Sequence, residues 1–373
     1  MFFNINKKSL KNYPVQYELM PDIILNCDQG WHRLRSDNVI VYSKGYCNTL
    51  DLQQLMARVQ PIPKFKGNFL AVVVQDDKIY ITHDTNRGTP IYLGNDYISN
   101  LEKGEPVWAD CLLKIKSDFT VEKTYFEPCV PIDYNPSDEE IIEGIHKILC
   151  ETFENFLTHN TLPLKIFLSG GIDTMTLYSY LQQFTNNFEL VDYEYIKHTH
   201  FYKKNITELK KNWCYNQMHL WEDPCVLVSG ASGDENMLRG PKTLEIALTH
   251  HGTNLHEVCK RNPTGYHYKY FSKKDIQLTN NELVCAKSIK GMKKLILNRN
   301  LNDFQHWHLD KTLTFTPFKD LDLLQLILKG SKDLIQKQAA DAYINKELIK
   351  LTNSSNLKLI SNYKNFDTFE NFN

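Results

Sequence analysis

The residues best placed to do chemistry follow a short apolar run near the middle of the chain. The run Ile166 to Leu168 ends in the glycine-rich loop Ser169–Gly171, and Asp173 and Thr174 then open a segment with helical potential. Adjacent glycines let an anion approach backbone N–H groups, and a helix N-terminus adds more N–H groups and the positive end of its dipole. This pattern predicts a phosphate site, although a bare strand, glycine loop and helix is more often purely structural.

Asp173 is unexpected in an anion site unless a divalent cation lies between its carboxylate and the phosphate. A second apolar run, Cys225 to Val228, also ends in small residues, followed by Asp234 and Glu235. Strands that alternate with helices form a parallel sheet, and ligands bind at its carboxyl edge. We therefore expect the two loops to meet there. Read alone, the second loop would be an ordinary turn with a capping acid.

Both loops resemble those of a known enzyme family. The run Ser169 to Thr174 reads SGGIDT and resembles the SGGxD[ST] loop of the ATP pyrophosphatases, which cleave ATP between its α and β phosphates. The run Ser229 to Glu235 resembles the SGxG[SA]DE segment of asparagine synthetases, except that the family commonly has a glutamate, which acts on the acceptor substrate, where this chain has Ala231. The resemblance implies a parallel-sheet, adenine-nucleotide α-hydrolase-like (PP-loop) domain that uses ATP and Mg²⁺.

The resemblance also implies which residues form the site. Those that would bind ATP are Leu168, Ser169, Gly170, Gly171, Asp173, Thr174, Ser229 and Gly230. Those that would act in catalysis are Asp173, Asp234, Glu235 and Lys319, and the metal ligands would be Asp173 and Asp234. Lys319 follows a Pro-Phe pair that resembles the family's R-x-PFLD segment. It is a candidate, with Lys332 and Lys337, to replace the lysine that the family places in a C-terminal tail, because residues 352–356 contain none.

The first 131 residues predict mainly strands. Asn38 to Ser43 alternates in polarity, and Phe69 to Val74 and Ile79 to Thr82 flank Asp76-Asp77 as a hairpin would. The segments Gly67 to Ala71 and His83 to Tyr92 resemble the class II glutamine amidotransferase domain of asparagine synthetases. That resemblance implies an Ntn-hydrolase-like αββα sandwich.

The nucleophile of such amidotransferase domains is a cysteine at the mature N-terminus. This chain has Phe2 and Phe3 there, and its first cysteine, Cys27, lies too far along the chain. Glutamine hydrolysis is therefore not expected. The β-lactam synthetases share the fold and also lack the cysteine, so its loss does not imply loss of the synthetase activity.

A linker divides the chain. Glu127 to Pro136 contains three prolines, which is typical of a linker. The chain has 373 residues, which is more than a single hydrophobic core usually serves. We expect two domains of α/β and α+β class, residues 1–131 and 132–373. In the second, Ser137 and Glu140 form a capping box at the start of a helix. A strand at Glu189 to Ile196, a helix near Ile206 to Met218 and a helix from Lys332 to Leu351 are also expected.

Composition limits the partners. The net charge of -1 and pI near 6.9 give no basic footprint, so nucleic acid is not expected. Nine scattered cysteines without CxxC spacing favour reduced thiols and a cytoplasmic location, and no apolar run approaches the roughly 18 residues of a membrane span. The pairs His250-His251 and His306-x-His308 lack acidic or cysteine partners at metal spacing, which favours packing or surface roles.

These features predict an ATP-dependent amide-forming synthetase. It would activate a small-molecule carboxylate as an acyl adenylate, release pyrophosphate and use ammonia or another amine, without a glutaminase of its own. Two alternatives stay open: a PP-loop enzyme that adenylates a nucleobase or tRNA, and a non-catalytic ATP-binding or scaffold protein. The sequence leaves homo-oligomerisation open.

Overall fold

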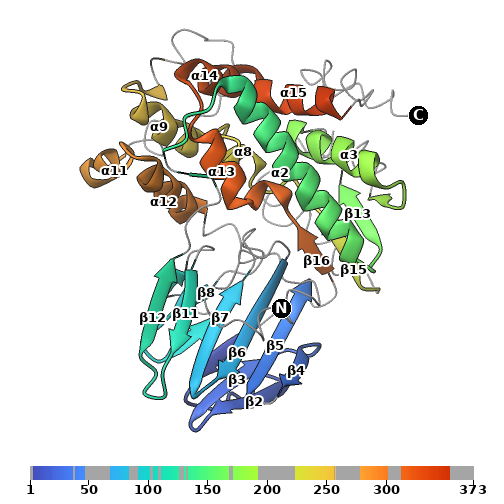
Figure 1. Cartoon of the computed structure of the whole chain (residues 1–373), viewed down its shortest axis with the longest axis vertical. Coiled ribbons are helices and arrows are strands. Elements are labelled where there is room, and N and C mark those ends of the chain that lie inside the picture. The colour runs from blue at the N-terminus through green and yellow to red at the C-terminus, as the bar shows by residue number, and fades with distance from the viewer. Residues whose placement is uncertain are drawn as a thin grey trace, which may run out of the picture.

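The chain has a strand-rich part and a part in which helices surround a parallel sheet (Figure 1). The computed structural model describes residues 3–36, 38–46, 68–83, 91–100, 104–107, 111–125, 130–131, 133–167, 171–191, 223–255, 257, 278–300 and 312–352. The strand-rich part covers 3–125, and the helical part covers 130–352.

The strand-rich part consists of two antiparallel six-stranded sheets. The first has the order β10-β8-β9-β1-β3-β2, formed by β1 (Phe3–Asn6), β2 (Val15–Met20), β3 (Ile23–Cys27), β8 (Ile91–Leu93), β9 (Tyr97–Ser99) and β10 (Glu105–Val107). The second has the order β12-β11-β7-β6-β5-β4, formed by β4 (His32–Ser36), β5 (Val39–Tyr46), β6 (Asn68–Gln75), β7 (Lys78–His83), β11 (Cys111–Ile115) and β12 (Val121–Tyr125).

The two sheets pack face to face. Ile5 and Leu25 of the first sheet share one buried cluster with Leu70, Ile81 and Leu113 of the second. Alternate residues of a strand point to the same face, so each sheet contributes every second side chain to this core. The sandwich fits the expected layers. The described residues between 3 and 125 contain no helix, so the outer helical layers of an αββα sandwich stay a prediction.

The hairpin expected around residue 76 is confirmed. Strands β6 and β7 pair from Leu70 opposite His83 to Gln75 opposite Lys78. The two turn residues, Asp76 and Asp77, have φ of 48° and 54°. Positive φ at both central residues is what a two-residue hairpin turn requires.

The helical part is built around a four-stranded parallel sheet of order β14-β13-β15-β16. Its strands are β13 (Leu164–Phe167), β14 (Glu189–Val191), β15 (Cys225–Val228) and β16 (Thr312–Phe315). The helices are α2 (Asp138–His159), α3 (Ile172–Phe184), α8 (Gly233–Asn236), α9 (Pro241–His250), α11 (Asn280–Cys285), α12 (Ile289–Asn300), the 3-10 helix η3 (Pro317–Lys319), α13 (Leu321–Ile327), α14 (Lys332–Asp341) and α15 (Tyr343–Leu351).

Helix α2 begins at the expected capping box and covers the sheet. The Ser137 hydroxyl accepts a hydrogen bond from the Glu140 N–H at 3.2 Å, and the Glu140 carboxylate accepts one from the Ser137 N–H at 2.7 Å. Phe153 of α2 is fully buried, stacks on Tyr180 of α3 and meets Phe315 of β16 edge-on. Burial of such a ring stabilises the fold by about 1.5–3 kcal/mol.

The single helix expected from Lys332 to Leu351 is wrong, because the chain breaks at Ala342. Ala342 has a φ of 50° and separates α14 from α15. The Gln338 side chain accepts a hydrogen bond from the Ile344 N–H at 2.7 Å, so a side chain supplies the partner that a continuous helix would have provided. The expected helix near 206–218 and the strand residues beyond 191 lie outside the described residues.

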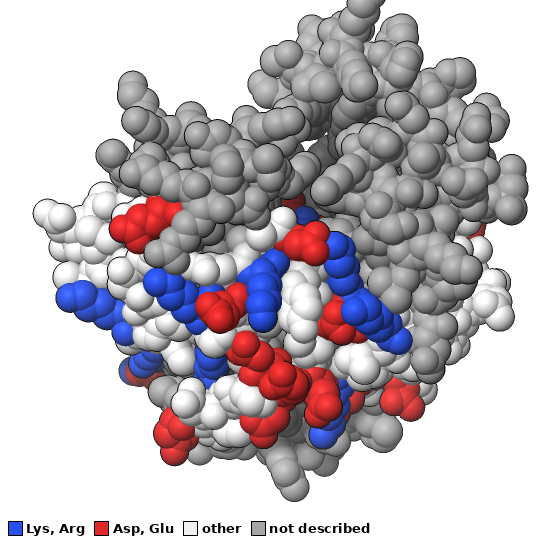
Figure 2. Space-filling model, turned by 90° about the horizontal axis from the view of Figure 1, so that it is seen from above, with Lys and Arg blue, Asp and Glu red and all other residues white. Residues whose placement is uncertain are grey.

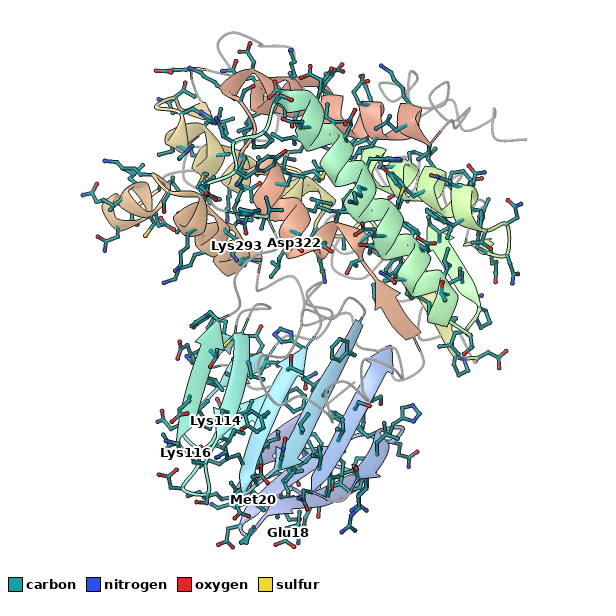
Figure 3. The ribbon with its side chains drawn as sticks, viewed as in Figure 1. Glu18, Met20, Lys114, Lys116, Lys293 and Asp322 are labelled. Atoms are coloured by element: carbon teal, nitrogen blue, oxygen red, sulfur yellow. The ribbon has the colours of Figure 1, made fainter. Side chains whose placement is uncertain are left out.

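The buried clusters do not mix the two parts, since one contains only residues from 130 onward and the others only residues up to 121. Lys293 of α12 and Asp322 of α13 lie on the edge of the helical part that faces the strands (Figure 3). Figure 2 shows basic and acidic side chains interspersed over the described part of one face. None of the described helices is both long and apolar enough to cross a bilayer.

Candidate functional site

The first loop delivers Asp173 to the start of a 13-residue helix. Gly171 is the N-cap of α3, in an extended conformation, and no side chain caps the helix. Asp173 and Thr174 lie in its first turn, where backbone N–H groups and the helix dipole favour an anion. Leu168, Ser169 and Gly170, which the sequence assigns to the same anion site, lie outside the described residues.

The second loop leaves strand β15 beside the first. The Ser229 N–H donates to Phe315 O at 2.9 Å, which holds the loop at the carboxyl edge of the sheet. A Cβ atom on Gly230 would lie 3.1 Å from Thr174 N, and one on Gly233 would lie 2.5 Å from Asp173 Cγ. The second loop therefore packs against the first turn of α3, which follows the first loop, and glycine at 233 is required for this close approach.

Arg239 bridges the two carboxylates that the sequence assigns to a metal. Its Nη1 lies 3.1 Å from Asp173 Oδ1, its Nη2 lies 3.2 Å from Asp173 Oδ2, and Nη2 also donates to Asp234 Oδ1. The Arg239 side chain is only 5% exposed, whereas Asp173 is 13% and Asp234 52% exposed. The pairing with Asp173 is bidentate, the geometry in which a guanidinium recognises a carboxylate most strongly.

A buried polar network supports Asp173 from the other side. The Asn345 amide of α15 donates to Asp173 Oδ1 at 3.3 Å and to Thr176 Oγ1 at 3.2 Å. Asn345 Oδ1 in turn accepts from Gln338 Nε2 at 2.7 Å, and the same nitrogen donates to Met237 O at 3.0 Å. Since Gln338 and Asn345 are fully buried, this network fixes the α14–α15 break against both loops.

Burial raises the pKa of the Asp173 carboxyl to about 7. Loss of hydration is the largest cause, the Arg239 guanidinium opposes it, and the neighbouring Asp234 carboxylate adds to it. Arg239 therefore favours the charged form of Asp173, whereas burial and Asp234 favour the neutral form and together outweigh it.

Mg²⁺ does not fit between the two carboxylates while Arg239 holds both. Mg²⁺ requires close, near-octahedral oxygen ligands, and here both carboxylate oxygens of Asp173 and Oδ1 of Asp234 accept hydrogen bonds from Arg239 or Asn345. Within the part of the chain that the structure describes, no group of three or more His, Cys, Asp or Glu side chains converges on one point.

The other predicted site residues lie around the second loop. Ser229 Oγ accepts from the Ala231 N–H at 3.2 Å, and Glu235 lies in the short helix α8 beside Asp234. Asn236 Nδ2 donates to Phe318 O at 2.6 Å, which ties η3 to α8. Lys319, the next residue, is 5% exposed. The structure therefore brings η3 to the second loop.

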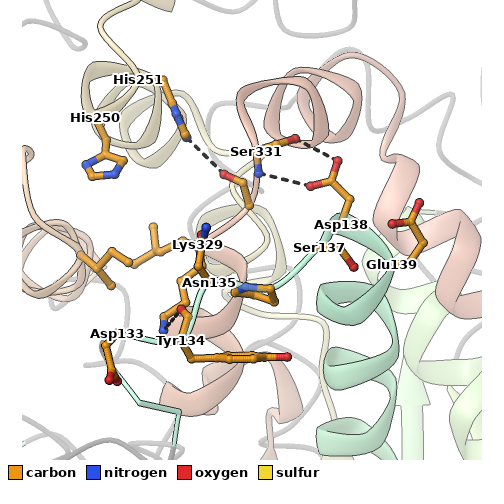
Figure 4. A pocket seen from close by; sticks show the side chains of 14 residues that line it. Asp133, Tyr134, Asn135, Ser137, Asp138, Glu139, His250, His251, Lys329 and Ser331 are labelled. Atoms are coloured by element: carbon orange, nitrogen blue, oxygen red, sulfur yellow. Dashed lines mark hydrogen bonds between the residues drawn. The ribbon is translucent and has the colours of Figure 1, made fainter.

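A hollow of about 530 Å³ lies away from these loops, between the linker, the end of α9 and the turn before α14 (Figure 4). Its polar side chains bind neighbouring backbone: Lys329 Nζ donates to Tyr134 O at 2.6 Å, and His251 hydrogen-bonds Gly330 O at 3.2 Å. His250 Nδ1 also hydrogen-bonds a backbone carbonyl, Lys287 O, at 3.1 Å. The hydrogen bonds of Lys329 hold the linker in place at this hollow. None of the residues predicted to bind ATP lines it.

In the strand-rich part, the first cysteine is not set up as a nucleophile. Cys27 ends β3, pairs in register with Phe3 of β1 and is fully buried. Burial, with the neighbouring Asp28 carboxylate, raises the pKa of its thiol to about 12. A thiol with such a pKa is protonated at neutral pH and is a poor nucleophile.

Comparison with known proteins does not show a family. No family model matches the chain, and no curated protein matches it. Solved structures that match include an allosteric regulatory enzyme of purine biosynthesis, at 12% identity and a TM-score of 0.21 over 39% of this chain and 46% of that one.

A second matching structure is glutamine phosphoribosylpyrophosphate amidotransferase from B. subtilis, solved with ADP and GMP. It has 11% identity and a TM-score of 0.21 over 58% of this chain and 63% of that one. The chain thus spans less than two thirds of either protein. Structural similarity at a TM-score of 0.21 is too weak to indicate the fold or the function of this chain.

The sequence did not indicate two residues of the site. Arg239 lies between Leu238 and Gly240 outside any motif, and Asn345 lies 172 residues from the carboxylate that it contacts. A weak signal existed for the arginine, since it is the first basic residue after Asp234 and follows two apolar residues, Met237 and Leu238.

Proposed function

We propose that this protein is an ATP-dependent ligase that activates a small-molecule carboxylate as an acyl adenylate for attack by ammonia or another amine. One observation carries the proposal: at the carboxyl edge of a parallel sheet, the second glycine-rich loop packs against the first turn of α3, and Asp173 and Asp234 lie within reach of a single cationic group. Two acidic residues from separate strands converge in this way where phosphate charge and a counter-cation must be held together.

The reaction proposed has two steps. A substrate carboxylate oxygen attacks the α-phosphorus of ATP, the bond to the bridging oxygen breaks, and pyrophosphate leaves. An amine nitrogen then attacks the acyl carbon, loses a proton and displaces AMP. In the first step the N–H groups at the start of α3 would stabilise charge on the leaving pyrophosphate, since they are aimed at the loop edge before reaction begins.

Isotope exchange tests the first step alone. Full-length protein is incubated with labelled pyrophosphate, ATP as its magnesium complex and a panel of amino acids and other small carboxylic acids. Incorporation of label into ATP in response to one acid is the expected result. Asp173→Asn should lower that exchange by about 100-fold or more, because Asp173 would hold the cation that offsets the negative charge of the leaving pyrophosphate.

Asp341→Asn is the matched control, since Asp341 is an exposed aspartate at the end of α14 that pairs with Lys346 on the surface. This variant should exchange at the wild-type rate. Full exchange in Asp173→Asn would contradict the assignment of the site to the two loops.

A second candidate function is ATP binding without turnover. It is favoured by the Arg239 bridge, which leaves the pair of carboxylates already neutralised in part, and by Ala231 in the second loop. Calorimetry with ATP separates the two: binding of ATP together with no exchange across the acid panel would support this second function.

A further inference from the structure

We infer that Arg239 is a built-in counter-cation that competes with divalent metal ions for the Asp173–Asp234 pair. This competition rests on the proposed function in one respect, namely that a divalent metal ion would accompany ATP at the site. It concerns which cation occupies the pair in the protein without nucleotide, and it predicts that metal binds there only when the arginine side chain leaves.

The first support is that Arg239 is firmly seated. Its guanidinium makes two hydrogen bonds to Asp173 and one to Asp234, and the side chain is 5% exposed. Its backbone is also held, because Asp234 O accepts the N–H groups of Arg239 at 2.7 Å and of Gly240 at 2.6 Å. A side chain tied at both ends is a defined element of the site.

The second support is the charge balance. Two carboxylates and one guanidinium leave a net charge of about -1, and a divalent cation added to all three would bring it to about +1 with two cations in contact. A divalent cation in place of the arginine would bring it to zero. The carboxylates can therefore hold either cation well but not both.

The third support is that nitrogen donors, rather than the oxygen ligands of a metal site, lie around the Asp173 carboxylate. The Asn345 amide donates to it, and Gln338 orients Asn345. The Asn345 amide and the Arg239 guanidinium both donate hydrogen bonds to the Asp173 carboxylate. This arrangement supplies nitrogen donors where a metal site would have oxygen ligands.

Titration with Mn²⁺ followed by electron paramagnetic resonance tests this inference in the full-length protein without nucleotide. Wild type should bind Mn²⁺ weakly. Arg239→Gln should bind it at least about 30-fold more tightly, because the competing cation is gone. The double variant Arg239→Gln with Asp173→Asn should lose the gain. Arg35→Gln, which removes an exposed arginine from β4, is the matched control and should behave as wild type.

A further variant keeps the test valid if Arg239→Gln folds poorly, and a thermal measurement adds a second readout. Arg239→Lys keeps the charge but presents a single ammonium, which cannot form the bidentate pair, so its Mn²⁺ affinity should fall between wild type and Arg239→Gln. Mn²⁺ should also raise the melting temperature of Arg239→Gln while leaving that of wild type unchanged.

Mn²⁺ binding by wild type as tight as by Arg239→Gln, and abolished by Asp173→Asn, would overturn the inference. So would folded Arg239→Gln and Arg239→Lys without any gain. Failure of pyrophosphate exchange together with the expected Mn²⁺ gain would reject the proposed ligase and keep the competition, so the two failures are distinguishable.

Discussion

The two parts of this protein bury polar side chains for different purposes. In the strand-rich part, fully buried Asn26 accepts from the Leu10 N–H at 2.8 Å and donates to Lys8 O at 3.1 Å, so it serves the backbone of one nearby turn. In the helical part, Asp173, Arg239 and Asn345 come from three separate segments and meet at one sheet edge.

This difference locates the candidate function. A buried polar group that bonds nearby backbone stabilises a fold, whereas charged groups that converge from distant segments are costly to bury and are kept where they bind or react. Asp28 of the strand-rich part is instead paired within one short stretch of chain, because its carboxylate accepts from Lys44 Nζ at 2.5 Å and from Trp31 Nε1 at 3.0 Å. These donors hold the pKa of Asp28 below the ordinary value despite burial.

The largest effect expected from this comparison is in cysteine reactivity. With iodoacetamide at pH 8, Cys27 should label at least about 1,000-fold more slowly than an ordinary thiol, because its raised pKa leaves little thiolate and burial blocks access. Among the cysteines that the structure describes, Cys285, which is exposed on α11, should label first. Mass spectrometry of time points measures both rates.

Cys285→Ser provides the control for that experiment, since it should remove the fast label and leave Cys27 unchanged. Rapid labelling of Cys27 in the folded protein would show that the strand-rich part does present a nucleophile.

A smaller effect, in stability, tests whether the two parts unfold separately. Phe153→Ala should destabilise the helical part by about 3–5 kcal/mol, and Ile81→Ala the sandwich by about 2–5 kcal/mol, because each empties a fully buried site. Hydrogen exchange should therefore speed up by about 100-fold in β13 and β15 for the first variant and in β6 and β7 for the second.

Leu283→Ala, on the exposed face of α11, is the matched control and should change exchange very little. Equal acceleration in both parts by either core substitution would show one cooperative unit, in conflict with the separate buried clusters.

Features set by neighbouring residues were predictable from the sequence. The hairpin around Asp76-Asp77 and the capping box at Ser137 each depend on residues within a few positions, and both are present. The approach of the second loop to Asp173 and Thr174 was also predictable, because parallel strands with short exits bring their carboxyl ends to one edge.

Features set by distant partners were not predictable. Arg239 contacts Asp173 across 66 residues, and neither residue carries a local signal of the other. The break at Ala342 likewise depends on Gln338 turning inward to Asn345 and Ile344 rather than on any helix-breaking residue. The sequence thus indicated two carboxylates in need of a cation, whereas tertiary packing decided which cation lies between them.

The smallest effect concerns the cap that starts the helical part. Ser137→Ala should lower its free energy of unfolding by about 1 kcal/mol, because the Glu140 N–H loses its acceptor at the first turn of α2.

Thr158→Ala removes a hydroxyl from the same helix, where it only bonds Glu154 O at 2.8 Å, and should cause no such loss. Denaturant titration compares the two, with hydrogen exchange in β6 and β7 as the reference for the sandwich. Since α2 packs its apolar face on the sheet that carries both loops, the loss should be confined to the helical part. An equal loss in Thr158→Ala, or a loss shared by the sandwich, would contradict the local role of the cap.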